Sequence, residues 1–183
     1  MAETKLLRYG DYIYIHSTGD NTKTYLCARS ILEEAVFFLE CPFIEENSVH
    51  YENQSELVFA IYPKLSYQAY KNYMKRKANE DSYKVELLKK RLRVETEHNE
   101  KIISQMMGTP ITFGSEIQLY HVYSKTFVRA TREKNSLNND LYNLRLTRKG
   151  GSGVYFKITP FYSFKKEGEK LTVSDKFYLE NTK

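Results

Sequence analysis

The chain has 183 residues, of which 41% are hydrophobic and 28% charged, and its formal net charge is +5. That length suits one domain with a buried core, and no run approaches the roughly 20 apolar residues that a membrane span needs. The first residues also lack the apolar segment of a secretory signal, so we expect a cytosolic chain in which Cys27 and Cys41 stay reduced.

The positive charge is concentrated in one segment. Between positions 71 and 93 there are nine basic and three acidic residues, so that segment carries +6 and the remainder carries −1. The composition therefore predicts a near-neutral body with a basic appendage.

The first part of the chain is typical of short β-strands. We expect strands at residues 12–15 and 25–28, with a polar turn between them at 17–21. A short apolar run at 36–39 predicts another strand, residues 45–56 are polar and predict a loop, and a strand at 57–61 is stopped by Pro63.

After Pro63 the apolar period changes from two to about 3.6 residues, which indicates helices. Ser66 is the expected N-cap of a first helix, whose aromatic side faces away from its lysines. Residues 79–82 break the pattern and cap a second helix at about 83–107, with Val85, Leu88, Leu92, Ile102 and Met106 on one stripe. Residues 95–101 have almost no apolar face, so we expect part of this helix to stand in solvent.

The β pattern resumes after Pro110 and repeats the first part of the chain. We expect strands at 117–122, 126–130, 144–146 and 154–158, with loops at 135–140 and 149–153. Both parts open on an aromatic-Gly pair, continue with Thr-aromatic-aliphatic-x-Ala, and close on Phe-x-Ile-x-Pro. Residues 175–179 then align with 115–119, as the opening strand of a third unit.

Three such units predict a mainly β fold, a β-trefoil with an inserted two-helix arm. We expect one domain, in which residues 1–63 form the first repeat, 64–108 the helical hairpin arm, 109–160 the second repeat and 161–183 the start of the third. Judged by the second unit, the third lacks roughly 40 residues within this sequence, so another chain or segment would have to complete the barrel.

No catalytic, metal or cofactor site is predicted. The glycine-rich loop at 150–153 opens a strand, whereas a phosphate loop opens a helix, so we interpret it as a connection. His16, His50, His98 and His121 are scattered, and neither cysteine belongs to a Cys-x-x-Cys pair. The near-equivalent places of His16 and His121 are better explained by the repeat than by a ligand pair.

The basic arm is the strongest functional feature. Its basic side chains form either a solvated helix face or a docking site for an acidic or calmodulin-like partner; anionic lipid is a further alternative. Nucleic acid ranks last, because the body is not basic. The candidate contact residues are Lys75, Arg76, Lys77, Lys89, Lys90 and Arg91.

Four stretches carry a family resemblance. They are Leu-Arg-Tyr-Gly-Asp-Tyr-Ile at 7–13, residues 57–71, Phe-Gly-Ser-Glu-Ile-Gln-Leu-Tyr-His at 113–121, and Val-Tyr-Phe-Lys-Ile-Thr-Pro-Phe-Tyr at 154–162. In content and order they resemble the N-terminal domain of inositol trisphosphate receptors, with ryanodine receptors as more distant relatives.

The resemblance implies a β-trefoil with a helical arm, often called the suppressor domain. Such a domain binds no inositol phosphate alone, lowers the affinity of the ligand-binding region that follows it, and couples binding to opening of a calcium channel at the endoplasmic reticulum. It places the family's coupling tyrosine, in a Pro-Phe-Tyr motif, on Tyr162. The ligand-contacting basic residues would lie in the following region, which this sequence does not contain.

We therefore expect a non-catalytic regulatory domain that works through protein partners. Phe161 and Tyr162 are candidate contacts with a neighbouring domain, although burial in the core fits the sequence equally well. The alternative is a stand-alone β-trefoil that docks into a larger assembly, such as a cytoskeletal or ciliary one. A small phosphate-ligand binder is the third alternative.

Overall fold

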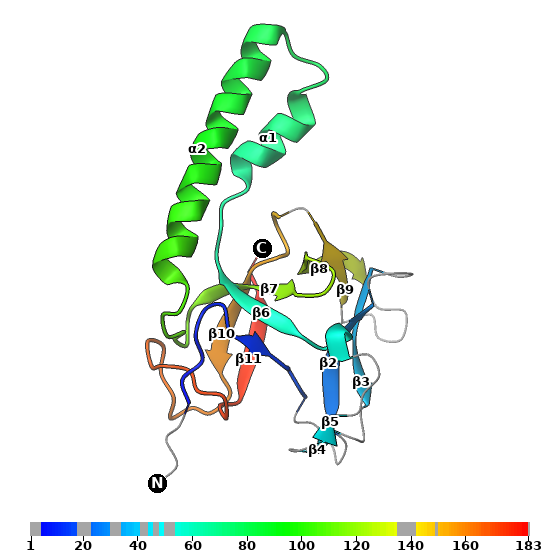
Figure 1. Cartoon of the computed structure of the whole chain (residues 1–183), viewed down its shortest axis with the longest axis vertical. Helices are drawn as coiled ribbons and strands as arrows, with labels where there is room; N and C mark the ends of the chain where they lie inside the picture. Colours follow the sequence, from blue (N-terminus) through cyan, green and yellow to red (C-terminus); the bar gives the residue numbers. More distant parts are fainter. Residues whose placement is uncertain are drawn as a thin grey trace.

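The computed structural model describes residues 5–17, 23–29, 34–40, 44–45, 48–49, 54–134, 142–148 and 150–182, and every structural statement below concerns those residues. They form a β body from which two helices project side by side (Figure 1). The predicted loop at 135–140, His50 and Cys41 lie outside the described residues, while Cys27 is buried and its thiol lies 3.5 Å from the carboxylate of Glu56.

Five strands form the wall of a barrel. They are β1 (Tyr12–Ile13), β6 (Phe59–Pro63), β7 (Glu116–His121), β10 (Phe156–Pro160) and β11 (Phe177–Asn181). Each neighbouring pair is antiparallel, in the order β1-β6-β7-β10-β11. The alternation of apolar and polar residues points one face of each strand into the core.

Two hairpins cover one end of this barrel. The first joins β2 (Thr24–Arg29) to β3 (Ala35–Glu40), and the second joins β8 (Thr126–Lys134) to β9 (Tyr142–Thr147). β3 also pairs with β9, so the hairpins of the first two units touch. The fold is the predicted β-trefoil.

The segment predicted as a loop at 45–56 contains some local structure. β4 (Ile44–Glu45) pairs with β5 (Ser48–Val49), and a 3-10 turn, η1, spans Gln54–Glu56. These elements are only two or three residues long. Such short elements leave no recognisable apolar periodicity in the sequence, which is why the sequence predicts a loop.

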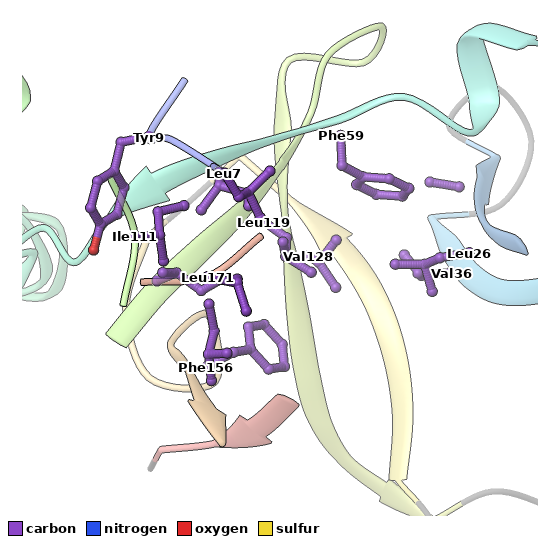
Figure 2. Close-up of a cluster of buried hydrophobic side chains, with 14 of the residues drawn as sticks. Leu7, Tyr9, Leu26, Val36, Phe59, Ile111, Leu119, Val128, Phe156 and Leu171 are labelled. Carbon is purple, nitrogen blue, oxygen red and sulfur yellow. The ribbon is translucent and has the colours of Figure 1, made fainter. Parts of the chain in front are cut away.

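A ring of three hydrogen bonds marks the pseudo-threefold axis. The N–H of Leu7 donates to the carbonyl of Leu171 (2.9 Å), Leu171 donates to Ile111 (2.8 Å), and Ile111 donates back to Leu7 (2.9 Å). All three side chains are buried and lie close together, away from Leu26 and Val36 (Figure 2). Each unit therefore contributes one residue to the same contact, as a trefoil requires.

The turn that follows each ring residue is repeated as well. The N–H of Asp11, Ser115 and Asp175 donates to the carbonyl three residues earlier, at 3.1, 3.1 and 3.2 Å. Gly10 and Gly114 both have φ of +89°, and they donate to Ile61 and Ile158 of the two Phe-x-Ile-x-Pro strands. These bonds are what the expected equivalence of residues 115–119 and 175–179 requires at its first residue, although the third turn uses Ser174 where the others use glycine.

The arm consists of α1 (Gln68–Arg76) and α2 (Ser82–Met106), close to the predicted bounds. Asp81 caps α2 as expected, because its side chain accepts from the N–H of Lys84 at 2.9 Å. Leu88 is buried in the arm, while Met106 packs against the body's core. The predicted apolar stripe of α2 therefore packs within the arm at Leu88 and against the β body at Met106.

The predicted cap of α1 is wrong. Tyr67 stands at the N-cap position without a side-chain cap, and the carboxylate of Glu95 on α2 accepts from the N–H of Ala69 (2.7 Å) and Tyr70 (2.9 Å). Ser66 instead donates its hydroxyl to Glu95 (3.0 Å). Part of the stretch expected in solvent, Glu95 with Asn99, thus holds the start of α1, because a carboxylate satisfies the free amides of a helix N-terminus.

The root of the arm is joined to the barrel by buried polar and aromatic groups. The amide of Gln118, fully buried on β7, accepts from the N–H of Leu65 (3.2 Å) and bonds the hydroxyl of Tyr67 (3.0 Å). Tyr155 donates its hydroxyl to the carbonyl of Leu65 (2.6 Å) and stacks on Tyr67. Burial raises the pKa of Tyr155 to about 12, so it remains a hydrogen-bond donor at neutral pH.

Candidate interaction surfaces

The stretch after Pro160 forms a cluster of exposed aromatic rings. Phe161, Tyr162, Phe164 and Tyr178, the aromatic patch, are between 40% and 69% exposed. Phe161 lies 5.0 Å from Tyr162 and 5.4 Å from Tyr178 between ring centroids, and Tyr162 stacks on Phe164 at 5.2 Å. The rings thus touch one another at the surface, and the alternative in which Phe161 and Tyr162 are core residues is excluded.

The backbone holds the aromatic patch in place. The N–H of Phe161 donates to the carbonyl of Lys176 (3.2 Å), and that of Lys165 to the carbonyl of Tyr162 (3.1 Å). Lys165 also pairs with Asp175 at 3.3 Å. Burial alone would raise the pKa of Asp175, but the hydrogen bonds of Thr172 and the pair with Lys165 outweigh it and lower that pKa. The loop is therefore tied to the third turn of the trefoil.

The six predicted basic residues of the arm are all exposed but do not share one face. Lys75, Arg76 and Lys77 stand at the end of α1 near the tip, and Lys89, Lys90 and Arg91 stand about 10 Å along α2 from its first residue. Three consecutive helical residues point in directions about 100° apart. Lys89 pairs with Glu86 (3.4 Å) and Lys77 lies over the ring of Tyr73. The six basic residues therefore do not form a single patch on the arm.

The outer side of α2 carries an exposed apolar stripe. Tyr83, Leu87 and Val94 are 43–81% exposed, and their spacing of four and seven residues places them within about 40° of one another around the helix. Lys90 lies about 20° beyond the edge of this sector, next to Tyr83. This outer stripe points away from Leu88, which packs inside the arm.

A cleft of about 390 Å³ lies between α1 and the body. Its lining includes Lys71, Lys75 and Arg129, together with residues 150–152. The glycine-rich loop packs closely on the arm, since a Cβ at Gly150 would lie 2.1 Å from the ring of Tyr67. The prediction that this loop leads into a strand is confirmed, because β10 begins at Phe156.

The histidines have separate environments. His16 is exposed beside the ring of Tyr25, His98 is exposed on α2, and His121 is fully buried with its Nε2 3.1 Å from the carbonyl of Ser55. Within the described parts of the chain, no three His, Cys, Asp or Glu side chains gather as metal ligands would. None of the described helices is long and apolar enough to cross a membrane.

The sequence also matches a known protein family over almost its whole length. The family described as "Inositol 1,4,5-trisphosphate/ryanodine receptor" matches residues 2–183. The chain belongs to this family. It is similar to the inositol 1,4,5-trisphosphate receptor itr-1 of Caenorhabditis elegans, with 31% identity over 91 residues, which cover 46% of this chain and 3% of the worm protein.

The family assignment confirms the predicted resemblance. The chain spans only about 3% of the length of the curated receptor that it matches, so the activity of a whole receptor is not transferred with the match. The roles of Tyr162 and of the basic arm in this family member remain our proposals.

Sequence reasoning missed several surface residues. Phe164 could have been predicted as part of the aromatic patch, because three of the four residues that follow Pro160 are aromatic. Tyr178 follows from alternation, since Phe177 and Leu179 pack against the core and their neighbour must point outward. Tyr83, Leu87 and Val94 recur at helical spacing, but among so many lysines their pattern does not stand out.

Proposed function

We propose that this domain is a non-catalytic regulatory module of a receptor-type protein and acts by contact with a neighbouring domain through the aromatic patch. The observation that carries the proposal is that four touching aromatic rings are exposed beside the Pro-Phe-Tyr motif, in a chain of the receptor family. Clustered exposed aromatics are what protein interfaces use as anchors. As in the suppressor domain that it resembles, such a contact would lower the ligand affinity of the neighbour and couple ligand binding to channel gating.

We also propose which ligands the domain does not bind and where in the cell it works. The domain itself binds no inositol phosphate and no nucleic acid, it requires no cofactor, and it works on the cytosolic face of the endoplasmic reticulum if it belongs to a channel. Its partners are proteins. Titration of the chain with inositol trisphosphate, read by calorimetry, tests the first statement, and a saturable heat would contradict it.

A trans-inhibition assay tests the coupling role. We would measure inositol trisphosphate binding to the ligand-binding region of the worm receptor with and without this chain added. We expect the chain to weaken binding about fivefold or more, the lower range of allosteric couplings. The double variant Phe161→Ala, Tyr162→Ala should lose this effect while keeping its fold.

The matched control is Tyr123→Ala, because Tyr123 is an aromatic residue at least as exposed as Phe161 and Tyr162 but lies on the β7–β8 turn, outside the aromatic patch. The control should inhibit as the unchanged chain does. If neither the chain nor the control alters ligand binding, the coupling role is wrong.

The outer stripe of α2 favours a second function, that of a docking protein in a larger assembly. Exposed Tyr83, Leu87 and Val94 with Lys90 between them form the apolar and basic face that an acidic amphipathic partner would bind. A docking role of this kind does not need a channel. It also includes the calmodulin-like partner that the arm's charge predicts.

Calcium-loaded calmodulin is the probe for this surface. Charge reversal at Lys89, Lys90 and Arg91 should weaken its binding at least tenfold, and added salt should weaken binding to the unchanged chain, because exposed charges are screened. The control reverses three exposed basic residues of the body, Arg132, Lys134 and Lys166. Equal losses in both triple variants would mean that only net charge matters, and would reject a specific arm site.

A further inference from the structure

The cleft between α1 and the body, which we call the α1 cleft, gathers positive charge that the described residues do not neutralise. Lys71 and Lys75 line it from α1, Arg129 lines it from β8, and its described lining contains no carboxylate. None of these three cations forms an ion pair with another residue that the structure describes. On α2, by contrast, Lys84 and Lys89 each pair with a neighbouring carboxylate.

The local sequence makes this concentration of charge unfavourable for the domain alone. α1 contains no acidic residue, and Lys71 and Lys75 lie one turn apart, so their charges repel each other on one face of the helix. Arg129 lies opposite Arg145 across the β8–β9 hairpin, and Glu133 pairs with Arg145 at 2.7 Å rather than with Arg129. A cleft lined by charges of one sign attracts an anion from outside the domain.

The backbones that carry the three cations are fixed next to the glycine-rich loop. On the body side, the N–H of Ala130 donates to the carbonyl of Gly153 (2.8 Å), and a Cβ at Gly153 would lie 3.2 Å from the Cγ of Arg129. On the arm side, a Cβ at Gly151 would lie 2.8 Å from the Nζ of Lys71. The two walls of the cleft are therefore in place before a ligand binds, which lowers the entropy cost of binding.

The α1 cleft continues into a second hollow at the root of the arm. This hollow has a volume of about 260 Å³, and it adjoins the cleft because Lys71 and Ser152 line both. Ser66 and Gln68 also line it, and their hydroxyl and amide groups can bond a peptide backbone. Together the two hollows have the size of a site for a ligand much larger than one phosphate group.

We propose that the α1 cleft binds a phosphorylated serine or threonine in an acidic segment of a partner protein. The phosphate lies between Lys71, Lys75 and Arg129, and the peptide runs through the second hollow. A phosphate monoester carries a charge of about −1.5 to −2 and three acceptor oxygens, so it matches three cations better than one carboxylate does. The planar guanidinium of Arg129 offers paired donors to two of these oxygens. Arg76 and Lys77, both exposed, continue the charge beyond the cleft and favour acidic flanking residues.

A compact anion is a poorer occupant than a peptide. The three cationic side chains are exposed, so water and salt screen their attraction for a free phosphate. A peptide adds contacts in the second hollow and places its acidic residues beside the end of α1. The site is also separate from the outer stripe of α2, since Tyr83 and Leu87 line neither hollow.

The probe is a fluorescent peptide with one phosphothreonine between runs of glutamate, added to the intact chain. We expect saturable binding by fluorescence anisotropy at physiological salt, at least tenfold tighter than that of the same peptide without the phosphate. Inorganic phosphate and a nucleoside triphosphate should bind at least tenfold more weakly than the phosphopeptide. In NMR spectra the phosphopeptide should shift the amide signals of Lys71, Arg129 and Ser152, and leave those of Tyr83 and Leu87 unchanged.

A double variant tests the cations of the cleft. Lys71→Gln with Arg129→Gln should bind the phosphopeptide at least tenfold more weakly and should lose most of the preference for the phosphorylated form. The matched control, Lys101→Gln with Arg132→Gln, removes the same charge from exposed positions on α2 and β8 outside the cleft, and should bind almost as the unchanged chain does. All four side chains are exposed, so both variants should keep the melting temperature of the unchanged chain.

Several results would overturn the proposal. Equal affinity for the phosphorylated and unphosphorylated peptides, or equal losses in the two double variants, would mean that only net charge matters. Binding of the nucleoside triphosphate or of a single-stranded oligonucleotide as tightly as the phosphopeptide would assign the cleft to another class of anion. Binding without a change in the signals of Lys71, Arg129 and Ser152 would place the peptide elsewhere.

Discussion

His121 is a residue that can gain a charge near neutral pH, yet its side chain is fully buried. The carbonyl of Ser55 can only accept, so Nε2 carries the proton, and Nδ1 accepts from the hydroxyl of Ser124 at 2.7 Å. Burial lowers the pKa of His121 below its usual 6.5, despite the opposing effect of its hydrogen bond to Ser55. The imidazole is thus a neutral structural group between β7 and η1.

The lowered pKa predicts a pH dependence of stability. The unfolded chain binds a proton at this histidine more readily than the folded chain, so the contribution is complete above pH 6.5 and is lost as the pH falls through the folded-state pKa. Each unit of difference corresponds to about 1.4 kcal/mol. Denaturant unfolding from pH 7 to pH 5 should therefore show a falling free energy of unfolding.

The variant His121→Gln separates this residue from other titrating groups. It should cost about 1–3 kcal/mol at pH 7, because buried partners lose hydrogen bonds, and its stability should fall less between pH 7 and pH 5. Exposed His16→Gln should keep the full slope. An unchanged slope in the His121 variant would show that another group is responsible.

At the scale of elements, the arm is stiffened by contacts between its helices. Glu95, on the fourth turn of α2, satisfies the first amides of α1, and Asn99 exchanges two hydrogen bonds with the backbone of Ser66 at 2.9 and 2.7 Å. A nine-residue helix is marginal by itself. α1 therefore depends on α2 for the hydrogen bonds at its start.

The variant Glu95→Ala should release the start of α1. We expect a loss of about 0.5–2 kcal/mol, the usual cost of removing an N-terminal cap, and faster hydrogen exchange at Ala69 and Tyr70. Glu97→Ala is the control, since Glu97 only bonds exposed Arg93, and it should cost less than about 0.5 kcal/mol. Equal exchange in both variants would contradict the capping role of Glu95.

The same contacts show why sequence alone predicts some elements and not others. The duplicated strands and the two-helix arm could be predicted because repeats and periodicity are local patterns. Glu95 could not be assigned, because its partners lie 25 and 26 positions away and Ser66 looks like a sufficient cap. Similarly, the sequence around Phe161 and Tyr162 fits either a core or a surface position. Only the placement of β11 beside them in the structure shows that they lie at the surface.

At the scale of the whole molecule, two units of the trefoil bury their inward side chains differently because the third contributes only β11 among the described residues. Ile117 is enclosed by strands on both sides of β7, while Ile13 has one neighbour.

The hydrogen-bonded ring of Leu7, Ile111 and Leu171 can close only late during synthesis of the chain. Leu7 is made before Leu171, so its N–H lacks its partner in the ring until Leu171 has been made, more than 160 residues later. At translation rates of about 5–20 residues per second, that wait lasts on the order of ten to thirty seconds. Until then the N–H of Leu7 can bond only to water or to another temporary acceptor, while the arm, whose contacts are local, is already able to form.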